Sequence, residues 1–464
     1  MTDNNDENPP DRPFNAFRVS TGVKARKLDA DVINQYQSYE KAHGLRKRAR
    51  KAKDQQTFHQ QIDSLISDLI HREITFPGRW LTVSFSKQKL SRNDRYTSPV
   101  MSKTLPDVVR TLVVPELDYI ELEIGYQNPF NTNLHRQSSI RAGKRLRQAI
   151  AEHSFRLDEF SLGKHQETII LRDNKDAFSN KASNLQYDDT AQTRLFRKQL
   201  QIINEWLEQA DIQFDSGLCK NQTVSGNDRH LVRIFNRGRF NQGGRLYGGF
   251  WQAIKNSERY DSISINDCNV VTLDFGQMAA RIMYGMAGVI PHFEDAYDLP
   301  GWTSYRAGVK TVFNAMLHAE ERHTRFPQGA GKAFKSPLLE QDAGKVLKLS
   351  LLKIDDVVEK IMEYHSPISH LFYAGHGLAV MFKESEILIN ALLRLIDSNI
   401  VALPVHDALV VSTKDIDVTR SIMLQVFKEQ TGIEGLVNIE DELHLLHASS
   451  YVPSIGNIHV RGNE

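Results

Sequence analysis

Two aspartates constrain the fold of this chain more than any other feature, because each stands where an apolar run of β-strand character breaks. Asp274 stands near the end of the run NVVTLDF, and Asp407 interrupts the run IVALPVHDALVVS. Two carboxylates presented from adjacent strands can hold divalent metal ions against a triphosphate. The pattern therefore predicts that the fold brings Asp274 and Asp407 together on neighbouring strands.

The stretch TSYRAGVKTVFNAMLHA, which lies between the two aspartates, has the spacing of a helix. Arg306 and Lys310 are four residues apart and share one face, and Asn314 and His318 follow on nearly the same stripe. A carboxylate pair with a cationic helix between its members can bind both metal ions and phosphates. This combination indicates phosphoryl transfer.

The composition excludes several classes of protein. The chain has 464 residues, 40% of them hydrophobic and 25% charged, which is typical of two or three domains with their own cores. No apolar run approaches the roughly 18 residues of a membrane span, and the N-terminal residues lack the features of a signal peptide. We therefore expect a cytoplasmic protein with no membrane partner. Cys219 and Cys268 have no paired spacing, so they are expected to fill the core.

The net charge is only +1, but the charges are unevenly distributed along the chain. Residues 1–30 begin with an acidic, proline-containing stretch and are expected to form a disordered tail. Residues 31–56 form a basic helical segment that ends in GLRKRARKAK, which is dense enough in cations to contact a phosphate backbone. A solvated helix end would give the same pattern.

Residues 57–155 show the order of elements of a winged helix: an amphipathic helix, a second helix, and a hairpin with a long polar turn. On this interpretation the segment binds DNA. The residues nearest the DNA would be Ser102, Lys103 and Arg110 on the second helix and His135, Arg136 and Arg141 on or beside the hairpin. A helical accessory domain would show the same local pattern, and Pro106 fits the second helix only in its first turn.

Residues 156–227 contain a strand-like ETIILRD and a long amphipathic helix, and we expect them to form a connecting region whose helix serves packing. The character of the chain changes over residues 228–464. HLVRIFN, GGRLYGGFWQ and SISINDCNVVTLDF predict three strands in quick succession, which is typical of an antiparallel sheet. The expected fold class is therefore α+β.

The order of the segments GGRLYGGFWQ, DFGQMAARIMYG, RAGVKTVFNAMLHA and LPVHDALVV resembles the polymerase core shared by family A DNA polymerases and the single-subunit phage RNA polymerases. The resemblance covers about residues 228–415. The matching positions are Asp274, Gln277 and Arg281 in motif A, Arg306 and Lys310 in motif B, His406 and Asp407 in motif C, and Gly244-Arg245-Leu246 upstream. Each match alone is weak, but their common order makes coincidence improbable.

The resemblance implies a polymerase palm with an antiparallel sheet and fingers helices, preceded by a thumb-like connecting region. It implies two Mg²⁺ or Mn²⁺ ions held by Asp274, Asp407 and the carbonyl of Phe275. Arg306 and Lys310 would bind the phosphates of a nucleoside triphosphate, and Lys310 would protonate the leaving pyrophosphate. The other implied contacts are Gln277, Ala279, Asn314 and His318 to the nucleotide and Arg245, Gln252 and His406 to a DNA primer-template.

Departures from the family pattern leave the sugar preference open. Ala279 lies five residues beyond Asp274, where the DNA enzymes have a glutamate and the phage RNA enzymes a glycine, so it leaves room for a 2′-hydroxyl. Ala408 follows the motif C aspartate, where the DNA enzymes have a second acid and the RNA enzymes a serine. His318 and Ala319 stand where both groups have tyrosine and glycine. Ribonucleotides therefore remain candidate substrates.

Only 133 positions separate Asp274 from Asp407, which is fewer than the family pattern leads us to expect. We therefore expect reduced fingers and low processivity. Residues 1–225 also lack the acidic motifs of a proofreading exonuclease.

Three hypotheses remain open. The first is a compact template-directed nucleotidyltransferase, primase-like, for the replication or repair of a mobile element. The second is a dedicated DNA polymerase of the same fold. The third is a catalytically silent DNA-binding replication initiator or regulator, in which Arg306 and Lys310 would have no reason to accompany both aspartates. The oligomeric state stays open in all three.

Overall fold

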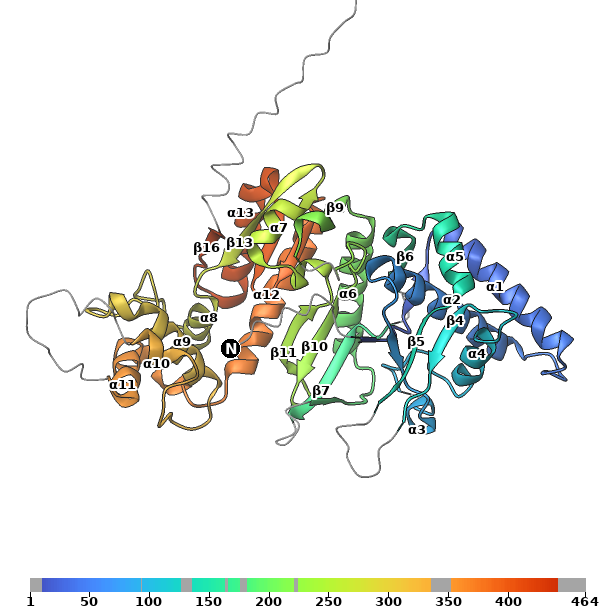
Figure 1. Cartoon of the computed structure of the whole chain (residues 1–464). Helices are drawn as coiled ribbons and strands as arrows, with labels where there is room; N and C mark the ends of the chain where they lie inside the picture. Colours follow the sequence, from blue (N-terminus) through green and yellow to red (C-terminus); the bar gives the residue numbers. More distant parts are fainter. Residues whose placement is uncertain are drawn as a thin grey trace, which may run out of the picture. The chain divides into compact units, whose positions relative to one another are not determined.

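The computed structural model describes residues 11–92, 94–126, 136–162, 166–175, 182–220, 224–334 and 352–440. The chain forms two compact units (Figure 1). The first unit comprises Met1–Gln209, Phe214–Arg233 and Tyr247–Ser262, and the second comprises Ala210–Gln213, Ile234–Leu246 and Ile263–Glu464. The predicted boundaries at residues 30, 56 and 155 all fall inside the first unit, so the segments that they separate belong to one compact body.

The second unit is built on a sheet of six strands within the described residues. The strand order is β14 (Ala402–Val405), β15 (Ala408–Ser412), β13 (Cys268–Phe275), β12 (Ile263–Ile265) and β9 (Ile212–Phe214), and β16 (Val437–Glu440) pairs with β13. Strand β13 pairs antiparallel with β12, β15 and β16, and β14 pairs antiparallel with β15. The predicted combination of helices with an antiparallel sheet is therefore confirmed.

Strand β13 lies inside the sheet because its sequence is almost continuously apolar. Val270, Val271 and Leu273 are buried. Asn266 and Asp267, which form the two-residue turn between β12 and β13, have φ angles of 51° and 57°. A hairpin turn with positive φ at both positions matches the twist of its strands. The turn thus sets the register in which Asp274 arrives at the far end of β13.

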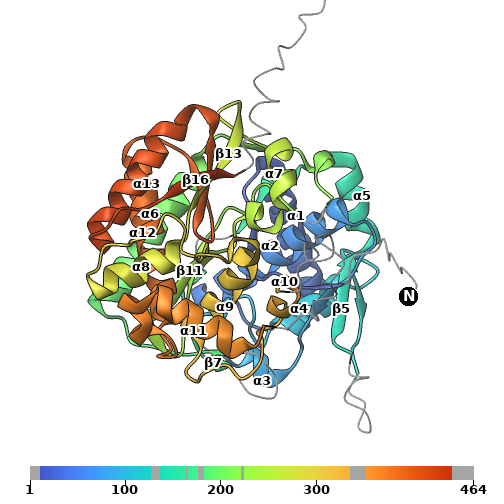
Figure 2. The same cartoon turned by 90° about the vertical axis from the view of Figure 1, so that its left-hand side faces the viewer.

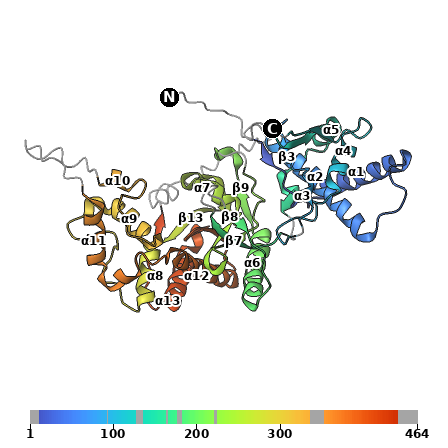
Figure 3. The ribbon, with the colours of Figure 1, turned by 90° about the horizontal axis from the view of Figure 1, so that it is seen from below.

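Helices pack on the sheet and extend the second unit at one end. They are α8 (Met278–Ala287), α9 (Arg306–His318), α10 (Ala330–Ala333), α11 (Ile354–Tyr364), α12 (Gly377–Asp397) and α13 (Ile416–Thr431), with 3-10 turns at Thr303–Tyr305, Ser366–Leu371 and Thr413–Asp415. Helices α12 and α13 pack side by side, and α13 contacts the sheet (Figure 2). Helices α9, α10 and α11 gather at one end of the unit (Figure 3). The hairpin of β10 (Val232–Asn236) and β11 (Arg239–Tyr247) carries Arg245.

A buried histidine holds the helical end together. One ring nitrogen of His365 lies 2.8 Å from the carbonyl oxygen of Ala296, and the other lies 3.2 Å from the hydroxyl of Tyr284. The ring also packs edge-on against Phe313 of α9. Burial lowers the pKa of His365 to about 4, so the ring is neutral at physiological pH. These contacts fix the loop that precedes α9.

The first unit packs its helices against a sheet of four strands among the described residues, in the order β1 (Arg12–Pro13), β3 (Leu81–Val83), β5 (Ser138–Ala142) and β4 (Ile120–Glu123). Its helices are α1 (Val23–Ala42), α2 (Ala52–Thr75), α3 (Lys87–Leu90), α4 (Leu105–Leu112), α5 (Lys144–His153), α6 (Ala191–Gln209) and α7 (Asn256–Ser262). Shorter elements are β2 (Arg18–Ser20), β6 (Phe160–Leu162), β7 (Ile169–Lys175), β8 (Ala182–Asn184) and 3-10 turns at Leu157–Glu159, Ser216–Leu218 and Phe250–Ala253. None of the helices described in either unit is long and apolar enough to cross a membrane.

The expectation of a disordered tail is wrong for residues 11–30, which form β1, β2 and the start of α1. A buried carboxylate on α2 accounts for this order. Asp68, which is 0% exposed, accepts hydrogen bonds from the guanidinium groups of Arg12 at 2.6 Å and Arg18 at 3.1 Å and from the backbone N–H of Asn15 at 2.8 Å. A buried charge requires such partners, so folding of α2 recruits the N-terminal segment.

Residues 57–155 differ in two details from the predicted winged helix. Helix α4 begins at Leu105 with Pro106 in its first turn, so Ser102 and Lys103 precede the helix instead of lying on it. Strands β4 and β5 do form the predicted antiparallel hairpin, but β5 also pairs with β3, so the hairpin is part of a larger sheet. His135 lies outside the described residues.

Candidate active site

The structure brings Asp274 and Asp407 to one cavity of about 230 Å³ in the second unit. Asp274 lies on β13 opposite Ala408 of β15, and the N–H of Phe275 donates to the carbonyl oxygen of Asp407 at 3.3 Å. Asp407 occupies the two-residue turn between β14 and β15, next to His406. The antiparallel pairing of β13 with β15 therefore sets the two carboxylates side by side.

Left-handed backbone conformations flank both aspartates. Gln277 has a φ of 57°, and His406 has a φ of 56°. Such conformations are unfavourable for residues other than glycine and concentrate at functional sites, where the surrounding structure enforces them. The Gln277 side chain donates to the carbonyl of Glu294 at 3.0 Å and accepts from the N–H of Ala296 at 2.9 Å. Gln277 thus ties the start of α8 to the loop before α9.

Nine of the predicted site residues line this cavity. They are Arg245, Asp274, Phe275, Gln277, Ala279, Lys310, Asn314, His318 and Asp407. They come from β11, β13, α8, α9 and the turn after β14, so segments far apart in the sequence converge here.

Like charges gather around Asp274. Burial, the charge of Asp407 and the charge of Glu440 raise the pKa of Asp274 to about 7, and Lys310 partly offsets them. Glu440 comes from β16, where it pairs with Thr272, and no local sequence pattern marks its proximity to Asp274. The site therefore favours a bound cation or a proton.

The two cations of α9 have different surroundings. Arg306 is exposed, does not line the cavity, and donates through Nε to the carboxylate of Asp295. Lys310 lines the cavity, with its Nζ 5.9 Å from the centre of the Tyr297 ring. The guanidinium of Arg306 lies 5.8 Å from the same ring. Lys310 is therefore in place for a ligand in the cavity, whereas Arg306 first has to exchange Asp295 for that ligand.

Tyr297 is a lining residue that sequence reasoning missed. It is only 3% exposed, and burial, followed by the charges of Glu384 and Asp295, raises the pKa of its hydroxyl. No motif surrounds it in the sequence, because a tyrosine in a loop gives the same pattern whether it packs in the core or lines a site. Its ring forms the wall of the cavity next to Lys310.

A second missed residue, Glu384 of α12, holds Arg245 in the cavity. The guanidinium of Arg245 donates to its carboxylate at 2.8 Å. Burial raises the pKa of Glu384, and Arg245 counteracts the rise. The sequence does contain a signal for Glu384, because it is an acidic residue on the apolar face of a helix. Such a residue needs a buried partner.

Helix α12 also approaches α9 closely at Gly377. A Cβ atom at this position would overlap the imidazole of His318, so glycine is required for the contact. Burial and the charges of Arg245 and Arg237 lower the pKa of His318. His318 therefore lines the cavity as a neutral ring.

Other predicted residues lie elsewhere. His406 is exposed and does not line the cavity, and Gln252 belongs to the first unit, where it accepts from the N–H of Gly248 at 3.0 Å. Their predicted contact to a primer-template gains no support from the site geometry.

The predicted DNA-binding cations of the first unit take part in ion pairs. Arg110 pairs with Asp107 at 3.3 Å, Arg136 with Glu123 at 2.6 Å, Arg141 with Glu121 at 2.6 Å, and Arg50 of the basic segment with Glu40 at 2.7 Å, while Lys103 is exposed. Arg141 also lies 4.4 Å from the Trp80 ring. Neighbouring carboxylates thus weaken the positive potential that would attract a phosphate backbone.

The donor set of the cavity suits a hard divalent cation. In the described part of the chain no group of three or more His, Cys, Asp or Glu side chains could hold a metal ion. Mg²⁺, however, commonly takes only one or two protein carboxylates and completes its shell with substrate phosphates and water. Asp274, Asp407 and the Phe275 carbonyl meet that requirement.

The sequence matches no protein-family model and no curated protein. Among solved structures, the chain is similar to the POL domain of Pol1 from M. smegmatis in complex with a DNA primer-template and dNTP, with a TM-score of 0.30 and 13% sequence identity. The match covers 53% of this chain and 51% of that one, so the chain spans about half the length of that structure.

Proposed function

We propose that the chain is a template-directed nucleotidyltransferase of the polymerase type. One observation supports this most strongly: Asp274, Asp407 and Lys310, which strand pattern, helical spacing and motif order all indicate, line the same cavity. Chance would rarely bring two carboxylates and a lysine from three separate segments together. A metal-dependent nuclease would use the two carboxylates but would leave the cationic face of α9 without a role.

Asp274 and Asp407, with the carbonyl of Phe275, would hold two Mg²⁺ or Mn²⁺ ions. When bound, such ions lower the pKa of an attacking hydroxyl and neutralise the charge of a triphosphate. Burial, followed by the charges of Asp407 and Glu440, raises the pKa of Asp274, and a bound cation would relieve the repulsion among these carboxylates.

Lys310 would contact the triphosphate and donate a proton to the leaving pyrophosphate. Arg306 would join it by exchanging its exposed ion pair with Asp295 for a phosphate. A doubly charged phosphate with several acceptor oxygens competes well for a guanidinium group. Tyr297, beneath both cations, would limit their movement toward the core.

The nucleotide would lie against Gln277, Ala279, Asn314 and His318, and Arg245, held by Glu384, would face the primer end. The methyl group of Ala279 leaves space for a 2′-hydroxyl, so ribonucleotides are expected to be substrates and the activity to be primase-like. The second unit would act as palm and reduced fingers, and the first unit would hold DNA.

Incubation of the purified protein with primed or unprimed single-stranded DNA, Mg²⁺ or Mn²⁺, and ribo- or deoxynucleotides tests the proposal. We expect extended products that disappear in the Asp274→Ala/Asp407→Ala double variant. Products from deoxynucleotides alone would identify a dedicated DNA polymerase. Absence of product under every condition would contradict the proposal and favour a silent DNA-binding initiator or regulator.

A further inference from the structure

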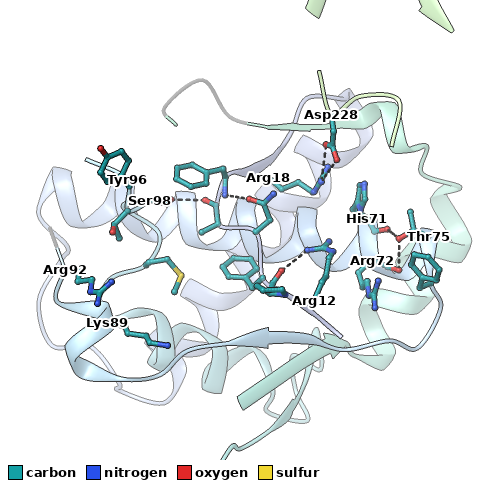
Figure 4. A pocket seen from close by; sticks show the side chains of 18 residues that line it. Arg12, Arg18, His71, Arg72, Thr75, Lys89, Arg92, Tyr96, Ser98 and Asp228 are labelled. Atoms are coloured by element: carbon teal, nitrogen blue, oxygen red, sulfur yellow. Dashed lines mark hydrogen bonds and ion pairs between the residues drawn. The ribbon is translucent and has the colours of Figure 1, made fainter. Parts of the chain in front are cut away.

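The first unit contains a larger cavity, of about 810 Å³, that the proposed chemistry does not use. It is formed by the N-terminal segment 12–18, the C-terminal part of α2, and the chain from α3 to residue 101. Figure 4 shows Lys89 and Arg92 on one side of it and His71 and Arg72 on the opposite side, with Arg12 and Arg18 between them.

Positive charge dominates the lining. The cationic side chains are Arg12, Arg18, Arg72, Lys89 and Arg92, and Asp228 is the one carboxylate among the lining residues. Asp228 accepts from Arg18 at 3.2 Å, and Asp68, which lies behind the lining, accepts from both Arg12 and Arg18. The lining thus has five cationic side chains and one carboxylate, and Asp68 adds a second carboxylate behind it. The described walls therefore carry an excess of positive charge.

Two buried side chains in the lining have unused hydrogen-bonding atoms. His71 is 3% exposed, and neither of its ring nitrogens has a hydrogen-bond partner within the described residues. The same holds for Nη1 of Arg18, which is also 3% exposed. Buried polar atoms are nearly always paired, so these two lining residues keep hydrogen-bonding capacity for a ligand or for bound water.

The state of His71 specifies what such a ligand offers. Burial and the charges of Arg18, Arg12 and Arg72 lower the pKa of His71 to about 2, so the ring is neutral. A neutral imidazole has one N–H donor and one acceptor nitrogen. It therefore suits a ligand that presents an anionic oxygen and a hydroxyl or N–H group.

Aromatic side chains also line the cavity, among smaller polar and apolar residues. Phe14, Phe17, Phe76 and Tyr96 contribute to it, together with Met101. The volume lies in the range of roughly 300–1,000 Å³ that is typical of pockets for small organic ligands. A carboxylate alone would use neither this volume nor the aromatic walls, whereas a nucleotide has a base to stack and phosphates to bind several guanidinium groups.

We propose that this cavity binds a nucleotide through its phosphate, either as a free nucleotide or as the phosphorylated 5′ end of a nucleic-acid strand. Cationic side chains of the lining, Lys89 and Arg92 among them, contact the phosphate, and the aromatic side chains hold the base. The site lies in the first unit and does not require the cavity around Asp274 to be catalytic.

Titration of the full-length protein with ATP, UTP and inorganic phosphate by calorimetry, and with 5′-phosphorylated or 5′-hydroxyl DNA oligonucleotides by fluorescence anisotropy, tests the proposal. Lys89→Ala/Arg92→Ala removes two exposed cations of the lining, and Lys87→Ala, on the same helix but outside the lining, is the matched control. We expect the double variant to bind about ten-fold or more weakly, since each change removes a charge-assisted contact, and the control to bind like the wild type.

Comparison of these probes also distinguishes a free nucleotide from the end of a nucleic-acid strand. Preference for ATP or UTP over the oligonucleotides identifies a free nucleotide, and preference for the 5′-phosphate over the 5′-hydroxyl strand identifies a strand end. The Asp274→Ala/Asp407→Ala protein should retain the binding, which keeps the result independent of polymerase activity. Equal affinity of the double variant and the control, or no binding of any probe by the wild type, would overturn the proposal.

His71→Leu gives an independent measurement. Leucine removes two unpaired buried polar atoms, so we expect the ligand-free variant to melt at a higher temperature than the wild type while its affinity for the bound probe falls. A variant with unchanged affinity would show that His71 does not face the ligand and would contradict the assigned site.

Discussion

Asp274 lies beside two further carboxylates, Asp407 and Glu440, and its raised pKa is a property that can be measured. Its folded-state pKa of about 7 lies above the ordinary value of 3.8, so the folded protein binds a proton that the unfolded chain releases. The stability that this proton contributes is fully present below pH 4, falls as the pH rises, and is lost above about pH 7.

Asp274→Asn should therefore stabilise the metal-free protein, and by more at pH 8 than at pH 5. The difference between variant and wild type should grow across pH 4–7 to on the order of 4 kcal/mol at most, since each pKa unit corresponds to about 1.4 kcal/mol. Urea denaturation in EDTA at a series of pH values measures it, with Asp397→Asn, an exposed aspartate at the end of α12, as the control. A difference that does not change with pH would mean that Asp274 is not held among like charges.

Substitution of Ala279 tests the sugar preference. Because its side chain lines the cavity at the start of α8, Ala279→Glu should fill the space beside a 2′-hydroxyl. We expect the ratio of ribonucleotide to deoxynucleotide incorporation to fall about ten-fold or more, as for a steric clash in a substrate pocket. Ala279→Gln, of the same size but without charge, should give the same fall. An unchanged ratio in both variants would show that the sugar lies elsewhere.

Elements that depend on local sequence were predictable. Strand β13 and helix α9 follow from apolar runs and helical spacing, and these patterns also indicated Asp274 and Lys310. The contributions of Tyr297, Glu384 and Glu440 were not predictable, because each reaches the cavity only through the packing of a loop, of α12 or of β16. The order of the N-terminal segment was not predictable for a similar reason. Arg12 and Arg18 bind Asp68, which lies on a helix 50 or more residues later in the sequence.

The packing of α9 against α12 gives a prediction about elements. Gly377→Ala should destabilise the second unit by about 1–3 kcal/mol, because the new Cβ overlaps the ring of His318. His318→Ala should restore most of this stability in the double variant, which a double-mutant cycle in urea would measure. If Gly377→Ala has no effect alone, or if its cost persists without the imidazole, the close approach of the two helices is not the cause.

At the scale of the whole molecule, the chain passes between its two units several times instead of dividing at one point. Residues 214–233 and 247–262 belong to the first unit although they follow the start of the second. Asp228 in the first of these segments pairs with Arg18, so the first unit is completed only after residue 228 has been made. Sequence patterns suggested consecutive domains because they report local structure. They do not show that a later segment of the chain packs back into an earlier unit. The cavity around Asp274 lies in the second unit and the cationic cavity lies in the first, so variants of each can be tested separately.

Whether Asp407 takes part in nucleotidyl transfer is tested by the rate of nucleotide incorporation by Asp407→Asn protein. DNA binding is measured on the same preparation, and Asp397→Asn is the control. Asparagine keeps the shape of the aspartate but removes its charge, so a metal ligand is lost and the fold is kept. We expect incorporation by Asp407→Asn to fall at least about 10³-fold, while its affinity for DNA and its melting temperature stay near those of the control. Incorporation at the control rate, or an equal loss of DNA binding and folding, would show that Asp407 is not a residue of the chemistry.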